Sequence, residues 1–285
     1  DEAPIHGRVA APPAKPGSTS SGGMLQKPAD NPWAITSVGG YGESSWAVVT
    51  SKGSGIKGQR VMLSGKAFPN DWVGQNYKDN YRVTAVAGDA NSWLVVMSEG
   101  QHAQRLLGYD QTKMKANTDE GYGITAISGW GDSWAVIMDK PSPYGAQRYT
   151  LPGAWDQPRK DWIKARWDEG YRITSVAGEN GPGEKNSWLA VLSMNSGLNA
   201  QAYFGPGEWP TDKIKDYASR GYRITGVTGH SSDRWVVVVS TGTSLGEQKW
   251  NYGGSFPESW LRTQWGLPAT TNNKSVEELA LEEVK

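Results

Sequence analysis

Residues 161–193 read DWIKARWDEGYRITSVAGENGPGEKNSWLAVLS and contain the pattern that organises most of this chain. Ile163 and Trp167 are four residues apart, which places them on one face of a predicted helix. A first predicted strand follows over 172–178, and a second begins after a loop at Trp188. The stretch therefore predicts a unit built from one helix and antiparallel strands.

Five copies of this pattern align along the chain at intervals of 41 to 51 residues. Each copy has a threonine with a glycine four residues later, and the threonines are Thr36, Thr84, Thr125, Thr174 and Thr225. A tryptophan opens the second strand of each copy: Trp46, Trp93, Trp134, Trp188 and Trp235. A glutamine 11 to 13 residues further on begins a third short strand: Gln59, Gln104, Gln147, Gln201 and Gln248. Such regular columns indicate an internal repeat.

The second strand of each copy is apolar at nearly every position, as in WVVVVS over 235–240. Such a run indicates burial on both faces, so we expect sheets to pack on sheets. Short loops rich in Gly, Asn, Asp and Ser favour antiparallel connections. Each repeat is therefore predicted to form a three-stranded antiparallel meander.

A helix is predicted after the third strand, in place of a fourth strand, at the outer edge of each unit. Apolar or partly apolar pairs four residues apart mark it: Val73 and Tyr77, Met114 and Thr118, Ile163 and Trp167, Ile214 and Ala218, Leu261 and Trp265. Residues 111–120 lack the aromatic residues that accompany this pair in other copies. The helix of that copy is the least clearly marked.

The fold class predicted from these patterns is mainly β with short helices. Five meander units without a polar capping repeat favour a five-repeat, β-propeller-like ring over an open stack. The ring is predicted to span residues 32–268. Residues 1–31 read as an extended arm rich in Pro, Gly and Ser, and residues 269–285 as an acidic tail with a short helix.

Composition excludes several classes of protein. The 285 residues have a formal net charge of zero and a neutral pI, so no overall field favours nucleic acid. No apolar run approaches the length of a membrane span. The absence of cysteine excludes disulfides and cysteine-ligated zinc. A first residue other than methionine suggests a processed, exported, periplasmic or organelle-lumen protein, although the compartment stays unknown.

The repeated polar and aromatic columns have structural interpretations beside functional ones. The five tryptophans are expected to pack between repeats, with an exposed sugar-binding platform as the alternative. The five glutamines are expected to bond backbone groups of neighbouring repeats. Arg82, Arg172 and Arg223 align with Ala34 and Gly123 in the other copies, so the repeat symmetry breaks there. These arginines, together with Trp130 and Trp155, are the candidate ligand contacts.

Catalytic and metal-binding motifs are not found in the sequence. His6, His102 and His230 fall at unrelated repeat positions, and neither HExxH nor GxSxG occurs. We therefore expect no catalytic residue, no metal and no cofactor. Acidic residues do recur between the first and second strands: Asp89, Asp132, Glu179, Glu184 and Asp233. Paired carboxylates at a suitable separation hydrolyse glycosides, which keeps a glycoside hydrolase as an alternative.

The motifs at 161–178 and 187–193, with WPTDKIKDYASRGYRIT at 209–225, carry a resemblance. Over about residues 32–266 the chain resembles the tryptophan-rich, propeller-like repeat domain at the C-terminal end of plant casein-kinase-I-like kinases, also seen in stand-alone bacterial proteins. The kinase part is absent, because no glycine-rich loop, HRD or DFG motif is present. The resemblance implies a binding or scaffolding module without chemistry of its own.

Three classes of function stay open at this level. The first is a non-catalytic protein-interaction or scaffolding subunit of a larger assembly, which docks on other protein subunits through its loops, N-terminal arm and C-terminal tail. The second is a secreted glycan-binding, lectin-like protein. Its aromatic candidates Tyr41, Trp130, Tyr144 and Trp155 do not occupy equivalent repeat positions, which counts against it. The third is the glycoside hydrolase.

Overall fold

A computed structural model describes residues 24–41, 45–88, 92–130, 133–180, 185–230 and 234–269. Within these ranges the chain is mainly β-structure with five short α-helices. The strands form several small antiparallel sheets, and none of these sheets closes on itself. The prediction of a mainly β fold with short helices is thereby confirmed.

Three kinds of strand and one kind of helix recur. The inner strands are β2 (Ala34–Tyr41), β5 (Tyr81–Gly88), β8 (Gly123–Trp130), β11 (Arg172–Asn180) and β14 (Arg223–His230). The middle strands are β3 (Ser45–Ser51), β6 (Trp93–Glu99), β9 (Ser133–Lys140), β12 (Lys185–Ser193) and β15 (Arg234–Ser240). The outer strands are β4 (Gln59–Ser64), β7 (Ala103–Leu107), β10 (Gln147–Tyr149), β13 (Gln201–Gly207) and β16 (Gln248–Tyr252). The helices are α1 (Asn70–Lys78), α2 (Gln111–Asp119), α3 (Gln157–Asp168), α4 (Thr211–Ser219) and α5 (Glu258–Trp265), and β1 (Met24–Lys27) is an additional edge strand.

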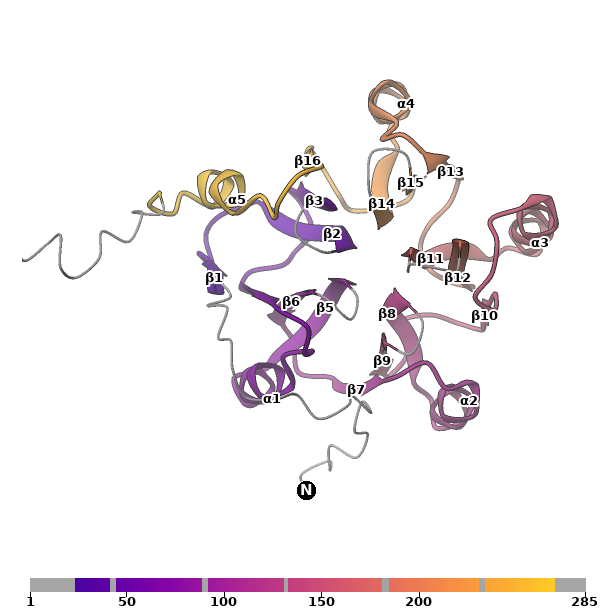
Figure 1. Cartoon of the computed structure of the whole chain (residues 1–285), viewed down its shortest axis with the longest axis horizontal. Helices are drawn as coiled ribbons and strands as arrows, with labels where there is room; N and C mark the ends of the chain where they lie inside the picture. Colours follow the sequence, from indigo (N-terminus) through magenta and orange to yellow (C-terminus); the bar gives the residue numbers. More distant parts are fainter. Residues whose placement is uncertain are drawn as a thin grey trace, which may run out of the picture.

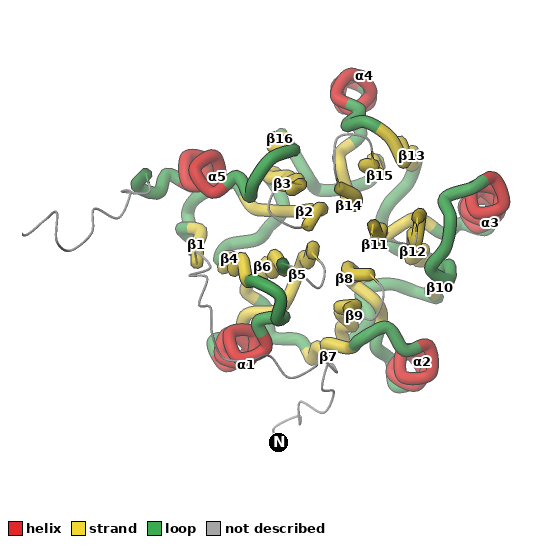
Figure 2. Tube along the Cα trace, viewed as in Figure 1, coloured by secondary structure: helices red, strands yellow, loops and turns green. Residues whose placement is uncertain are grey.

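The five sheets lie around a common centre (Figure 1). Their inner strands are nearest to that centre, and the helices lie at the periphery (Figure 2). Each inner strand contacts the inner strands of two other sheets, in the order β2, β5, β8, β11, β14 and back to β2. The residues aligned by the repeat are thus brought together at the middle of the molecule.

The predicted meander within each repeat is wrong. The third strand of a repeat pairs with the middle strand of the next sheet, so β4 pairs with β6 and not with β3. The sheet order is accordingly β4-β6-β5, and the three sheets that follow in the chain repeat it. A meander followed by a helix has the same order of elements along the chain as this strand–helix–strand–strand unit. The connection over 52–58 exceeds a two-residue hairpin turn and does not force β3 and β4 to pair.

The sheet that contains β2 and β3 is completed from the other end of the chain. Its outer strand is β16, which pairs antiparallel with β3 and sets Gln248 opposite Ser51. A second addition occurs at β4, where β1 pairs as a fourth strand. The predicted arm over 1–31 therefore contains a strand at 24–27. Residues 1–23 of that arm and the predicted C-terminal helix lie outside the described residues.

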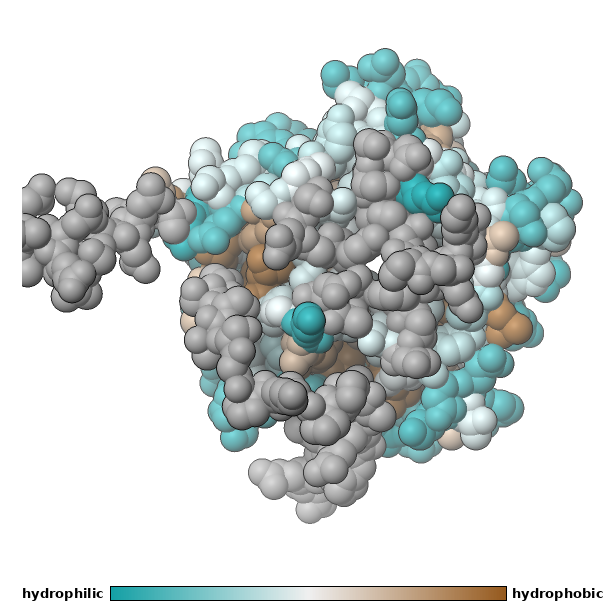
Figure 3. Space-filling model, in the orientation of Figure 1, coloured by the Kyte–Doolittle hydropathy of each residue, from teal (hydrophilic) through white to brown (hydrophobic). Residues whose placement is uncertain are grey.

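Each helix buries the first apolar residue of its predicted pair. Val73, Met114, Ile163, Ile214 and Leu261 are all almost completely buried. Helix α2 forms despite its weak sequence pattern, because Asp110 caps it by accepting a hydrogen bond from the Lys113 amide at 3.1 Å. The outward surfaces of the peripheral helices are largely hydrophilic (Figure 3). The apolar contacts of the helices are thus directed towards the sheets.

The hydrophobic cores lie between neighbouring sheets. Middle strands contribute to two of them at once: Val48 packs in one cluster with Leu94, whereas Val49 packs in another with Trp235. This is the two-sided burial that the apolar runs predict. Each repeated tryptophan also contacts the aromatic residue that precedes a helix. The pairs are Trp46 with Phe256, Trp93 with Phe68, Trp134 with Tyr109, Trp188 with Trp155, and Trp235 with Trp209.

Candidate functional site

The aligned threonine is a β-bulge residue in all five inner strands. In β11, Ile173 faces Leu192 and Ser175 faces Val191, so Thr174 has no residue opposite it. The register shifts in the same place at Thr36, Thr84, Thr125 and Thr225. A bulge bends its strand and redirects the side chain of the extra residue. This places five hydroxyl groups around the centre of the molecule.

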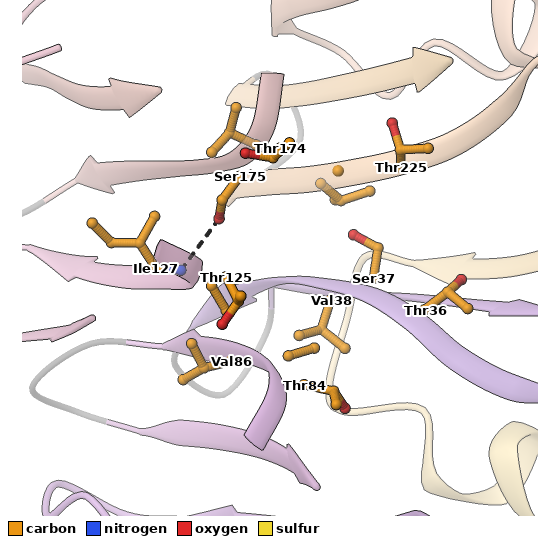
Figure 4. Close-up of a pocket in the computed structure, with 15 residues that line it drawn as sticks. Thr36, Ser37, Val38, Thr84, Val86, Thr125, Ile127, Thr174, Ser175 and Thr225 are labelled. Carbon is orange, nitrogen blue, oxygen red and sulfur yellow. Dashed lines mark hydrogen bonds between the residues drawn. The ribbon is translucent and has the colours of Figure 1, made fainter. Parts of the chain in front are cut away.

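A cavity of about 70 Å³ occupies that centre (Figure 4). It is lined by the threonine and the next two residues of each inner strand, among them Ser37, Ser175, Ile127 and Val176. A water molecule occupies roughly 30 Å³ of liquid, and ordinary ligand sites measure about 300 to 1,000 Å³. The central cavity therefore has room for a few waters. Its lining consists of hydroxyl, aliphatic and glycine residues, with no titratable side chain among them.

The threonine hydroxyls are hydrogen-bonded within their own sheets. Thr174 lies 2.7 Å from the Ser193 hydroxyl, and equivalent pairs join Thr36 to Ser51, Thr84 to Ser98, and Thr225 to Ser240. The third sheet differs because Asp139 replaces the serine, and Thr125 donates to the Ile137 carbonyl at 3.4 Å instead. Most of the polar capacity at the centre is thus used by the fold itself.

The repeated glutamines connect neighbouring sheets. The Oε1 of Gln201 accepts from the Ile173 amide at 2.7 Å, and its Nε2 donates to the Ile173 carbonyl at 2.9 Å. The same Nε2 also donates to the Ser240 hydroxyl at 2.9 Å. The partners of the other four are Ile35 and Ser98 for Gln59, Val83 and Asp139 for Gln104, Ile124 and Ser193 for Gln147, and Ile224 and Ser51 for Gln248. One amide side chain therefore joins the inner strand of one sheet to the next sheet.

The candidate ligand contacts Arg82, Arg172 and Arg223 make one set of backbone contacts. The Nε of Arg82 donates to the His102 carbonyl at 2.5 Å, and its Nη1 donates to the carbonyls of Tyr77 and Tyr81 at 3.3 and 2.8 Å. Arg172 and Arg223 bind the equivalent carbonyls. Cations at a helix C-terminus satisfy its last carbonyls and its dipole. A ligand role for these arginines stays a prediction.

The two repeats without this arginine differ from each other in what lies near its position. Where Ala34 replaces it, Lys27 of β1 donates through Nζ to the Lys57 carbonyl at 2.5 Å. Burial lowers the pKa of Lys27, and its side chain lies almost completely within the protein. Where Gly123 replaces it, an added Cβ would approach the Ser142 hydroxyl closely. Sequence reasoning missed Lys27 because it precedes the first repeat.

The candidate tryptophans have side chains that are either buried or outside the described part of the structure. All five repeated tryptophans are buried, and Trp134 is the most exposed at 5%. Trp155 is also buried and makes edge-to-face contacts with Trp188 and Tyr203. Trp130 ends β8, but its side chain is outside the described part. The flat faces of these buried rings pack against protein.

The side chains of Asp89, Asp132, Glu179, Glu184 and Asp233 fall outside the described residues, as do those of His6 and His230. His102 is described, and its Nε2 lies 3.2 Å from the Asp139 carboxylate. Among the described side chains, no group of three or more His, Asp or Glu could hold a metal ion. No helix in the same ranges is long and apolar enough to span a bilayer.

Comparison with known proteins places this architecture in a family. The chain belongs to the family described as "Domain of unknown function (DUF7477)", whose model matches residues 22–110 and 109–265. Over 56 residues the chain is 41% identical to casein kinase 1-like protein HD16 of Oryza sativa subsp. japonica. That stretch is 19% of this chain and spans 8% of the length of the rice protein.

Proposed function

We propose that the five sheets form a five-bladed, propeller-like ring. Four blades consist of an outer strand, a helix, an inner strand and a middle strand in chain order, and the fifth joins β2 and β3 to β16 from the other end of the chain. Support comes from the cyclic contacts between the inner strands and from the pairing of β16 with β3. Within one blade, β16 from near the end of the chain covers the edge of β3 from near its beginning, an edge that an open stack would leave exposed.

This ring acts, in our proposal, as a non-catalytic protein-interaction or scaffolding module. The observation that carries the proposal is the use of the repeated polar side chains. The glutamine, threonine and arginine columns bond groups of the protein itself, and the central cavity measures about 70 Å³. A role that depends on the periphery and the loops fits this distribution better than chemistry at the centre.

The rice relative gives independent support for a module that works beside other domains. Its name describes a casein kinase 1-like protein, and the similarity to this chain occupies a small part of its length. We propose that this chain likewise docks on other protein subunits. The surfaces proposed for docking are the loops between inner and middle strands and the segments 1–23 and 270–285.

Quantitative mass spectrometry of the cross-linked full chain, recovered from cells that naturally produce it, tests the proposal. A protein recovered in stoichiometric amount and lost on deletion of 1–23 or 270–285 supports docking through these segments. The purified partner is then titrated against the full and shortened chains. Unchanged melting temperatures of the shortened chains serve as the control for folding. A chain that stays monomeric without any stoichiometric partner, or that hydrolyses polysaccharide, contradicts the proposal.

A further inference from the structure

One position on the peripheral helices directs a ring towards the glutamine of the next sheet. On α1, the Tyr77 hydroxyl donates to the Oε1 of Gln104 at 3.0 Å. On α3, the Nε1 of Trp167 donates to the Oε1 of Gln201 at 3.1 Å. Both oxygens also accept a backbone amide, so their two acceptor positions are filled. On α1 and α3, an aromatic donor from the helix therefore completes the glutamine bridge.

Helix α4 has Ala218 at this position. The Oε1 of Gln248 accepts the Ile224 amide at 2.7 Å, and a methyl group replaces the ring that would supply the second donor. A cavity of about 300 Å³ lies there, lined by residues of α4, β14, β15 and β16. Its lining includes Ala218 and Gln248. The missing ring and the cavity thus coincide.

The walls of this cavity suit an aromatic guest. Apolar surface comes from Ile214 and Val239, and aromatic surface comes from Tyr222 and Trp250. Trp250 occupies the position that Tyr203 has in the preceding sheet, where Tyr203 contacts the Trp167 ring at 5.7 Å between centroids. Cavities of roughly 150 Å³ already accept benzene, so about 300 Å³ accommodates an indole. A planar ring here would find the surroundings that Trp167 has.

The cavity opens to solvent and has charged residues at its margin. Ala218, Tyr222 and Trp250 are each partly exposed. Lys215 and Glu247 contribute to the lining and are exposed, and Glu247 also pairs with Lys52 at 2.8 Å. Tyr217, the neighbour of Ala218 in the sequence, packs against Phe204 and Tyr222. Its ring is therefore not the second donor to Gln248. A group attached to a larger molecule could therefore enter from the periphery.

We propose that this cavity binds the indole of a tryptophan side chain presented by a protein partner, with the indole N–H donating to the Oε1 of Gln248. The guest takes the place that Trp167 fills on α3. The inference rests on the proposed interaction function and names the chemistry of one docking contact. Three other helices have an aromatic ring at the equivalent position, Tyr77, Trp167 and Trp265, whereas α2 has Thr118, which is exposed and donates to the Met114 carbonyl at 3.0 Å.

Ligand-observed fluorine NMR with N-acetyl-5-fluorotryptophan amide tests the cavity directly. Wild-type protein should bind this probe saturably. The 1-methyl derivative cannot donate the hydrogen bond and should bind roughly three- to tenfold more weakly. Equal binding of the two probes contradicts the role of Gln248. Binding of free 5-fluoroindole without binding of the amide contradicts a partner side chain as the source.

Two variants locate the site. Ala218→Trp fills the cavity from within and should weaken probe binding at least tenfold while leaving the fold intact by circular dichroism. Thr118→Trp is the matched control, because it adds the same side chain at the same position of α2 and should leave binding unchanged. Ala218→Tyr provides a smaller filling side chain if the tryptophan variant does not fold. Probe affinity that is equal in all folded variants places the site elsewhere and overturns the proposal.

Partner binding and probe binding distinguish the indole contact from the interaction function. A partner that binds Ala218→Trp as tightly as wild type docks on another surface, which overturns the indole contact and leaves the interaction function standing. Probe binding without any stoichiometric protein partner overturns the interaction function and leaves the indole specificity of the cavity standing.

Discussion

The Nε2 of Gln248 donates a hydrogen bond of 2.9 Å to the hydroxyl of Ser51, which precedes it by 197 residues. The same side chain brackets the backbone of Ile224 through both its oxygen and its nitrogen. A single amide thus connects the last outer strand, the first middle strand and the last inner strand. The contact that joins distant parts of the chain is the same contact that joins every pair of neighbouring sheets.

Replacing Gln248 by leucine should lower the free energy of unfolding by about 1 to 3 kcal/mol, because the amide and carbonyl of Ile224 lose their partner. Urea denaturation followed by tryptophan fluorescence measures the change. Gln157→Leu is the control, since that glutamine bonds Asp161 on the exposed surface of α3. Similar losses in the two variants would show that the bridge adds nothing beyond a surface contact.

Two glycine-to-alanine substitutions should change stability in opposite directions. Gly88 has a φ of 129°, and an added Cβ would lie 2.1 Å from the Ser92 carbonyl oxygen, so Gly88→Ala should destabilise the protein by more than about 1 kcal/mol. Gly74 lies within α1 with nothing within 4 Å of its added Cβ. Gly74→Ala should therefore stabilise by roughly 0.5 to 1 kcal/mol. Denaturation midpoints that move in the same direction would contradict this account.

A chain that ends at Gly246 should lose cooperative unfolding. The truncation removes β16 from the edge of β3 and removes Leu261 and Trp265 from a core that also contains Trp46. A separate peptide of residues 247–269 should restore a sharp thermal transition and the near-ultraviolet circular dichroism of the whole protein. A shortened chain that melts like the complete one without the peptide would mean that the first sheet is stable on its own.

Stability should fall as the pH rises above about 10, the pKa of an unperturbed tyrosine. Burial is the main cause that raises the pKa of Tyr77, so the folded protein keeps this proton after the unfolded chain has lost it. A raised pKa gives stability that is fully present below the unfolded value and is lost as the pH rises towards the folded one. Tyr77→Phe should flatten this alkaline decline in urea midpoints. Tyr252→Phe, at an exposed position, should leave the decline unchanged.

The sequence identified what depends on local pattern. The apolar runs marked the middle strands, and pairs such as Ile163 and Trp167 marked the helices, because burial imposes a period on each element. Local pattern does not determine the strand with which the third strand of a repeat pairs. That strand can belong to the sheet of its own repeat or to the next sheet. Gln59 begins that strand in either arrangement, so its position in the sequence does not reveal that it pairs opposite Ser98.

The candidate sites show the same limit. The five tryptophans and glutamines were located from their columns, whereas the position of Lys27 beside the Lys57 carbonyl depends on a strand outside the repeat. The bulge at Thr174 depends on the register between two strands, which the spacing of residues does not contain. A signal for the peripheral cavity was present in the helix pairs, where Ala218 aligns with Tyr77 and Trp167. This alignment indicates a cavity only when Ala218 and Gln248 are known to lie near each other.

The strand β16 is synthesised long after β2 and β3, the other two strands of its sheet. When β2 and β3 leave the ribosome, the strand that completes their sheet has not been made, because Gln248 is encoded 197 residues after Ser51. At translation rates of roughly 5 to 20 residues per second, the delay is about 10 to 40 seconds. Throughout that interval the edge of β3, which contains Val48 and Val49, can pair with any other strand that is present. Protection of the nascent chain is therefore needed most at its first sheet, which is the last to be completed.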